Sequence, residues 1–205
     1  MTPRTKEQNE AIRRQRMFQI QQTAAEVFME KGLNMEIGDI AKKAGLGRGT
    51  VYHYYNNKLT LLEELLAEAL EEAIRITGQT IDTDQCPLVR LERFAESQLN
   101  QWLEKPYLYI LFKTFFQTEP LPIHQQDKLR ETFSEQVYSP ILSTIKEATD
   151  AEKIASLDAE TMAQFYFGTL IGTASNYFHK KRMNEPVPPD WRDGVIILLF
   201  TGLKR

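Results

Sequence analysis

Several residue types and patterns are scarce in this 205-residue chain, and each scarcity excludes a class of protein. Cys86 is the only cysteine, so a disulfide framework within the chain is impossible, which suits a reducing cytoplasm. The longest apolar run, Val195 to Phe200, is far too short to cross a bilayer, which takes about 20 residues. No apolar stretch near the N-terminus resembles a signal peptide. We therefore expect a cytoplasmic protein that has no membrane partner.

Catalytic and metal-binding patterns are also missing. His124 and His179 are isolated in the sequence and have no partners at metal-ligand spacing. No Ser-His-Asp arrangement, nucleotide-binding loop or pair of catalytic carboxylates stands out. The acidic residues of the segment 58–77 are expected on the solvent face of a helix. We predict no metal, no cofactor and no enzymatic activity.

Helical periodicity is what the sequence does contain. Apolar residues make up 42% of the chain and charged residues 26%, a balance that can build a real core. Almost nothing reads as a strand, and prolines and glycines separate one helical segment from the next. We predict an all-α fold with helices over the approximate ranges 9–31, 37–44, 48–54, 57–77, 87–105, 107–117, 124–149, 158–181 and 191–203. Asn57 and Asp158 are expected to cap two of them, and Pro140 to kink the long one.

Charge is unevenly distributed along the chain, although its net value is only −3. Residues 1–58 hold ten Lys or Arg and six Asp or Glu, whereas residues 59–205 hold fifteen and twenty-two. A basic N-terminal part on an acidic remainder is typical of a DNA-binding module joined to a part that does not contact phosphates.

The segment 37–55 has the spacing of a helix-turn-helix. Ala41 is small enough to let a second helix cross closely, and Gly45 falls where the turn needs a positive φ. Apolar residues fall where two crossed helices bury them, including Ile40 and Val51. The second helix, from Arg48, then projects its outer side chains toward a DNA duplex.

Residues 24–62 resemble the DNA-binding domain of the TetR family of bacterial regulators. The matching residues are Ala24, Ala25, Phe28, Gly32, Ile37, Asp39, Ile40, Ala41, Ala44, Gly45, Gly49, Thr50, Tyr52, His53, Tyr54, Lys58 and Leu61. The resemblance implies a three-helix DNA-binding domain over residues 1–57. It also implies a helical ligand-binding and dimerisation domain over residues 58–205.

The resemblance implies roles for the start of the second motif helix. Arg48, Gly49 and Thr50 are expected at base edges, where an arginine can bind guanine through two hydrogen bonds. Gly49 lets the backbone come close to DNA, and Tyr52 and His53 are expected to contact phosphates or a thymine methyl group. Such phosphate contacts carry affinity and register rather than sequence choice.

The chain also departs from the family pattern around the first motif helix. Glu36 stands where a capping Thr or Ser is usual, so Asn34 is expected to cap instead, and both are assigned to the DNA-binding surface. Gly47 stands where Ser usually caps the second helix. Gly38 lies inside the short first helix, which it weakens by about 1 kcal/mol relative to alanine, and the helix is expected to order fully on DNA. Lys58 is expected to hold a phosphate.

The C-terminal part is rich in aromatic residues, which form either a plain core or the walls of a ligand cavity. The resemblance implies a cavity for a small apolar molecule, with Thr169, Thr173 and Asn176 among its polar anchors. The candidate ligand-binding residues are Trp102, Tyr109, Phe112, Phe115, Phe116, Gln117, Phe133, Tyr138, Tyr166, Thr169, Thr173 and Tyr177.

The last two predicted helices are candidates for a dimer interface. The stretch 195–200 is apolar on all sides, so the final helix needs cover on both faces, and small residues in the preceding helix allow close contact. A homodimer through a four-helix bundle satisfies both observations; a buried monomer core is the alternative. The candidate interface residues are Gly168, Ile171, Gly172, Ser175, Val195, Leu198 and Leu199.

These observations predict a homodimeric, ligand-responsive transcriptional regulator that binds a double-stranded DNA operator and represses until a small apolar effector releases it. Three alternatives stay open at this point. The protein could activate transcription, or it could respond to a protein partner rather than a small molecule. It could also be a helical enzyme or scaffold that carries the motif incidentally.

Overall fold

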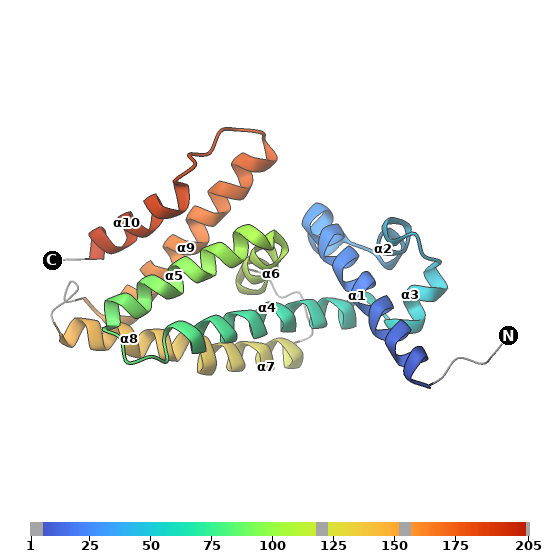
Figure 1. Cartoon of the computed structure of the whole chain (residues 1–205), viewed down its shortest axis with the longest axis horizontal. Helices are drawn as coiled ribbons and strands as arrows, with labels where there is room; N and C mark the ends of the chain where they lie inside the picture. The colour runs from blue at the N-terminus through green and yellow to red at the C-terminus, as the bar shows by residue number, and fades with distance from the viewer. Residues whose placement is uncertain (1–5, 118–122, 152–156, 204–205) are drawn as a thin grey trace.

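The computed structural model describes residues 6–117, 123–151 and 157–203, and every regular element in those ranges is a helix (Figure 1). In chain order the α-helices are α1 (Lys6–Lys31), α2 (Ile37–Ala44), α3 (Arg48–Tyr54), α4 (Lys58–Thr80), α5 (Pro87–Glu104), α6 (Pro106–Gln117), α7 (Ile123–Phe133), α8 (Ser139–Asp150), α9 (Ala159–Arg182) and α10 (Trp191–Leu203). A 3₁₀ turn, Gly32–Asn34, follows α1. The predicted all-α fold is confirmed.

One long helix, α4, connects the two ends of the molecule (Figure 1). Helices α1–α3 lie around its first turns, and we call them the head. We call helices α5–α10 the body; α5, α6 and α7 pack along the rest of α4, and α8, α9 and α10 pack on α5. The buried side chains of head and body form one continuous hydrophobic core. The N-terminal end of the chain therefore lies at the head and the C-terminal end at the far side of the body.

Polar side chains define where several helices begin and end. Asn57 Oδ1 accepts a hydrogen bond from the Thr60 N–H at 3.0 Å, and Asp158 Oδ2 accepts one from the Thr161 N–H at 2.9 Å, so both predicted caps are confirmed. Helix α1 begins at Lys6, earlier than predicted. Helix α4 continues past Gly78 to Thr80, whose buried hydroxyl donates to the Ile76 carbonyl.

The predicted long helix over residues 124–149 is interrupted before Pro140 by a π-helical segment, Ser134–Tyr138. The Ser139 N–H donates to the Ser134 carbonyl, one residue farther back than in an α-helix. A proline inside an α-helix lacks one hydrogen bond, and its ring collides with the carbonyl four residues earlier. The wider π turn accommodates that ring, and the chain then resumes as α8.

Candidate nucleic-acid interface and ligand cavity

The turn between α2 and α3 has the geometry that the motif predicts. Gly45 ends α2 with φ +66° and ψ +31°, a left-handed conformation that glycine adopts without steric cost. The Leu46 N–H donates to the Ala41 carbonyl at 2.9 Å, which satisfies one of the last carbonyls of α2. Gly47 then precedes the first residue of α3 and acts as its N-cap residue. The turn thus fixes the direction in which α3 leaves α2.

Helix α3 has one buried face and one exposed face. Val51 is completely buried on the side of α3 that packs on α2, and Tyr55, just after the helix, is also buried. The candidate contacts all lie on the opposite, exposed side: Arg48, Gly49, Thr50, Tyr52 and His53. The structure therefore gathers these side chains on one surface of the head that faces away from the core.

The candidate residues before and after the motif form a small network. Glu36 is the N-cap residue of α2, and its N–H donates to Asp39 Oδ2 at 3.0 Å. Asn34 belongs to the 3₁₀ turn and caps nothing, so that capping prediction is wrong; the Asp39 carboxylate provides the side-chain hydrogen bond instead. Lys58 Nζ lies 3.1 Å from Glu36 Oε1 and 3.3 Å from the Leu33 carbonyl oxygen. Lys58 is thus ion-paired in the DNA-free chain.

Three glutamates of α4, spaced four residues apart, bind polar side chains from other parts of the chain or from α4 itself. Glu64 Oε2 accepts hydrogen bonds from Tyr55 Oη at 2.8 Å and from Gln21 Nε2 at 2.9 Å. Glu68 Oε1 accepts one from Tyr107 Oη at 2.8 Å. The prediction that the acidic residues of this helix face solvent is therefore wrong for these positions. We call this row of contacts at Glu64, Glu68 and Glu72 the polar seam. It connects α4 to α1 in the head and to α6 in the body.

The third glutamate, Glu72, continues the seam with two cations. It pairs with Arg75 Nε at 2.7 Å and with Lys105 Nζ at 3.2 Å. Burial opposes ionisation, but the two cations outweigh it and hold the pKa of Glu72 below its usual value. The Glu72 carboxylate therefore stays charged and holds Lys105, which lies just before α6, against α4.

The tyrosines of the seam are held in their neutral, hydrogen-bond-donating form. Burial raises the pKa of Tyr55 and of Tyr107 well above the ordinary value, and the carboxylates of Glu64 and Glu68 raise them further. Both phenols therefore donate to their carboxylates throughout the physiological pH range. The two phenols therefore keep the same protonation state across that range.

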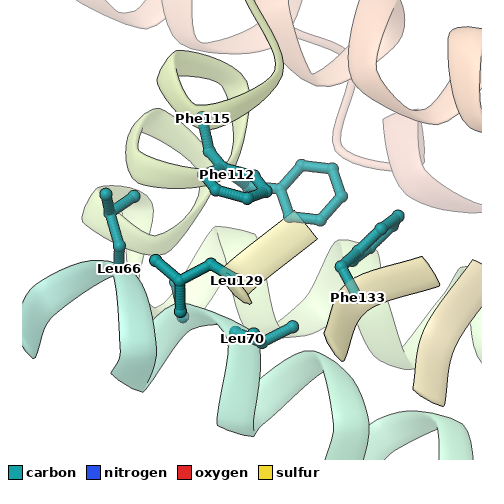
Figure 2. A pocket seen from close by; sticks show the side chains of 7 residues that line it. Leu66, Leu70, Phe112, Phe115, Leu129 and Phe133 are labelled. Carbon is teal, nitrogen blue, oxygen red and sulfur yellow. The ribbon is translucent and has the colours of Figure 1, made fainter. Parts of the chain in front are cut away.

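A small apolar cavity lies where α4, α6 and α7 meet (Figure 2). Its volume is about 20 Å³, which holds roughly one water molecule. The side chains that line it are Leu66, Ala69, Leu70, Phe112, Phe115, Leu129 and Phe133. A second, more open groove of about 170 Å³ shares Phe112 and Phe133 with it. The groove is completed by Tyr138, Gln164, Phe167 and Ile171.

Four of the candidate ligand residues line one of these two spaces: Phe112, Phe115, Phe133 and Tyr138. Others are packed into the core. These are Trp102 and Tyr109, whose rings meet at 5.3 Å, and Tyr166, whose hydroxyl donates to the Leu91 carbonyl at 2.6 Å.

The remaining candidate ligand residues, Thr169, Thr173 and Tyr177, line neither space, and the Thr173 hydroxyl bonds to the Thr169 carbonyl of its own helix. The side chains of Phe116 and Gln117 lie outside the described part of the structure. The sequence reasoning missed the wall that α4 contributes, because helical spacing does not distinguish Leu66, Ala69 and Leu70 from ordinary core residues.

Helices α9 and α10 expose apolar side chains on one side of the body. Ile197 and Leu198 are 64% and 67% exposed, and Phe165 is 48% exposed. Gly168 and Gly172 are also exposed, while Ile171 and Ser175 are half-buried.

Two other candidate interface residues, Val195 and Leu199, are buried within the chain itself, so their side chains lie on the inner face of α10. Ile197, which the sequence reasoning did not single out, lies on the outer face beside Leu198.

Across residues 6–117, 123–151 and 157–203, no helix is long and apolar enough to cross a membrane. Within the same ranges, no three His, Cys, Asp or Glu side chains come together in a way that could hold a metal ion.

Residues 20–65 match the family model described as bacterial regulatory proteins, tetR family. The chain is 35% identical to the HTH-type transcriptional repressor KstR2 of Mycolicibacterium smegmatis over 92 residues, 44% of this chain and 43% of that protein. The match thus spans less than half the length of that relative. The chain is also 26% identical to the HTH-type transcriptional repressor BepR of Brucella suis over 170 residues, 78% of each chain.

Solved structures show the same fold. The ketosteroid transcriptional regulator KstR2 of Mycobacterium tuberculosis superposes with a TM-score of 0.76 at 17% identity, covering 93% of this chain and 95% of that one. The transcriptional regulator FadR of Bacillus subtilis, solved in complex with stearoyl-CoA, superposes with a TM-score of 0.69 at 22% identity, covering 91% and 98%. The arrangement of the head on a helical body is therefore shared with these regulators.

Proposed function

Because the chain belongs to the TetR family of bacterial transcriptional regulators, we propose that it is a homodimeric repressor. The dimer binds a near-palindromic DNA operator. It leaves the operator when a small apolar molecule binds in the body. In this proposal residues 1–57 form the DNA-binding domain and residues 58–205 the ligand-binding and dimerisation domain. Two relatives named as repressors support repression over activation.

The single observation that carries DNA binding is the exposed outer face of α3. Arg48, Gly49 and Thr50 stand at the start of a helix whose other face is fixed by buried Val51. That orientation lets the start of α3 enter a major groove, where Arg48 binds a guanine and Thr50 a neighbouring base. Tyr52 and His53 then contact the flanking backbone.

In this proposal Lys58 changes its ion-pair partner when DNA binds, from the Glu36 carboxylate to a phosphate. Its ammonium group pairs with Glu36 in the free chain, and a DNA phosphate replaces that carboxylate in the complex. The exchange makes the Lys58 contact weaker than a contact from an unpaired lysine. It also leaves the Glu36 carboxylate beside the phosphate, and repulsion between the two anions reduces the affinity that this contact contributes.

Dimerisation brings two recognition helices to one operator. The exposed side chains of Phe165, Ile197 and Leu198 support an interface formed by α9 and α10, with Gly168 and Gly172 allowing the helices to come close. A twofold dimer presents two copies of α3 to half-sites about 34–36 Å apart, one turn of DNA.

The effector binds, in this proposal, between α4, α6 and α7. The cavity there is much smaller than the roughly 300–1,000 Å³ of a drug-sized site, so a ligand enlarges it by moving the aromatic walls and α4. Such movement shifts the equilibrium only by the difference in ligand affinity between the two states. The stearoyl-CoA bound to FadR supports an effector with an apolar chain.

The DNA proposal is tested by selecting binding sites for the purified full-length protein from a random double-stranded DNA library. We expect an enriched motif with two half-sites about ten base pairs apart. Fluorescence anisotropy on that motif should give affinity at least about 1,000-fold above scrambled DNA, with a steep dependence on salt. Equal, weak binding to both DNAs contradicts the proposal.

The effector proposal is tested with the protein–operator complex. Apolar compounds, among them free fatty acids and acyl-CoA thioesters, are screened for release of labelled operator and for a rise in melting temperature of the DNA-free protein. We expect a compound that does both, because a ligand of the released state stabilises that state. Regulation by a protein partner predicts no such compound and release by cell extract only.

A further inference from the structure

Gly38, the second residue of α2, lies directly beneath the side chain of Arg48. A Cβ atom added to Gly38 would lie 2.7 Å from Arg48 Nη2, 2.9 Å from Nε and 3.0 Å from Cζ. Contacts this short do not persist, so any residue other than glycine at this position displaces the guanidinium. The guanidinium therefore occupies the space that the missing side chain leaves.

The backbone of Gly38 does not itself require glycine. Among the described residues, the glycines with positive φ are Gly32 and Gly45, and Gly38 is in regular helix. Glycine inside a helix costs about 1 kcal/mol relative to alanine, and α2 has only eight residues. The position thus weakens a short helix, and the three heavy atoms nearest to an added Cβ all belong to Arg48.

Arg48 has no polar partner that fixes its side chain in the free protein. Within the described residues it forms no hydrogen bond and no ion pair, and it is exposed. The nearby N-terminal end of α2 carries partial positive charge, which does not attract a cation. The guanidinium therefore rests in the space beside the bare backbone of Gly38 without a polar partner among the described residues.

We propose that Gly38 determines DNA sequence preference by seating the Arg48 guanidinium against α2, in the position from which it binds a base. The inference rests on the proposed function, since it requires an operator that Arg48 reads. Recognition of guanine by arginine uses two parallel hydrogen bonds, so it depends on the orientation of the guanidinium plane. Seating the side chain beforehand also reduces the ordering cost of binding.

The test substitutes Gly38→Ala and measures stability and base preference separately. Alanine favours the helix, so the melting temperature should stay equal or rise. Base preference is measured by anisotropy on all single-base-pair variants of the selected operator. It should fall about tenfold at one base pair of each half-site, which lies within the discrimination that one arginine–guanine pair provides. Binding to scrambled DNA and the salt slope should not change, since phosphate contacts are untouched.

A matched control is Gly78→Ala, which also adds a methyl group to a helical glycine; Gly78 is exposed and has no heavy atom within 4 Å of the new Cβ. It should leave base preference unchanged. The decisive comparison is Gly38→Ala in an Arg48→Ala background. If Gly38 acts through Arg48, the double variant should show the same base preference as Arg48→Ala alone.

The outcomes separate this inference from the proposed function. Failure of the wild type to select any motif overturns the proposed function and the inference with it. If the wild type selects a motif, any of three results overturns the inference and leaves the proposed function standing. These are an unchanged preference in Gly38→Ala, a further loss when Gly38→Ala is added to Arg48→Ala, or an Arg48→Ala variant that keeps every base preference.

Discussion

The head and the body fill their cores with different side chains. Buried residues of the head are mostly aliphatic or small, such as Ile20, Ala24 and Ile40. The body instead packs rings that come from distant helices: Phe112 meets Phe133 at 5.6 Å, edge to face. No described residue of α1–α3 lines either of the two cavities, whereas rings of the body border the one beside Phe112. We therefore expect the body to repack more easily than the head.

The largest expected effect comes from removing one ring from each core. Phe28 of the head is completely buried, and Phe28→Ala should lower the free energy of unfolding by about 3–5 kcal/mol. Phe112→Ala should cost less, because Phe112 already borders empty space and its neighbours can collapse into it. Urea unfolding followed by circular dichroism measures both. Equal losses would remove the distinction between the two cores.

The second effect concerns the surfaces, since α10 of the body and α1 of the head both expose large apolar side chains but only α10 is proposed as an interface. Leu198→Glu should weaken the dimer by at least about 2 kcal/mol, roughly 30-fold in dissociation constant. Sedimentation equilibrium over a concentration series measures it. Phe18→Glu is the matched control, because Phe18 is 63% exposed on α1 of the head. A Leu198→Glu protein that dimerises like the wild type would contradict the interface.

The third effect is a loss of stability at alkaline pH, which depends on the contact between Tyr107 of α6 and Glu68 of α4. Burial, and then Glu68, raise the pKa of Tyr107, whereas an unfolded tyrosine ionises near pH 10. The stabilisation is therefore fully present below about pH 10 and is lost as the pH rises toward the folded-state pKa. Tyr107→Phe should flatten the fall in stability above pH 10 by up to about 1.4 kcal/mol per pH unit.

The measurement is urea unfolding at a series of pH values between 8 and about 11. Phe115→Leu is the control, since it changes packing on the same helix without removing an ionisable group. A Tyr107→Phe protein whose stability falls as steeply as that of the wild type would show that this phenol does not stay neutral in the fold.

The smallest expected effect is the loss of stability on removing the N-cap of α4. Asn57→Ala removes the side-chain hydrogen bond to the Thr60 N–H and should cost about 1 kcal/mol. Asn56→Ala, one residue earlier and exposed, should cost much less. Thermal unfolding of both variants measures the difference. Similar melting temperatures would mean that packing of the leucines of α4, rather than its cap, sets where the helix starts.

Local signals in the sequence predicted the head well. The bounds of α2 and α3 agree with prediction because each is set by neighbouring residues: Gly45 needs its left-handed conformation, and Gly47 precedes α3. Helix caps at Asn57 and Asp158 follow from the same short-range chemistry. Such features depend on three or four consecutive residues, which a sequence displays directly.

Features that depend on distant residues could not be predicted. Glu68 looks like a solvent-facing residue until Tyr107, 39 positions later, is known to reach it. The seat of Arg48 on Gly38 depends on how two short helices cross, and the glycine alone suggested only a weak helix. Along α4, the spacing of the leucines indicates that the helix has a buried face. It does not indicate that Leu66 and Leu70 border a cavity.

Cys86 gives the chain a built-in labelling position. It is the only thiol in the sequence, it is exposed, and it stands just before α5, beyond the end of α4 that is farthest from the recognition helix (Figure 1). The 23 residues of α4 span about 34 Å, so a fluorophore on Cys86 lies well clear of bound DNA. Maleimide chemistry will place one dye on each chain without any mutation. Energy transfer from that dye to labelled operator can then report movement along the whole length of α4.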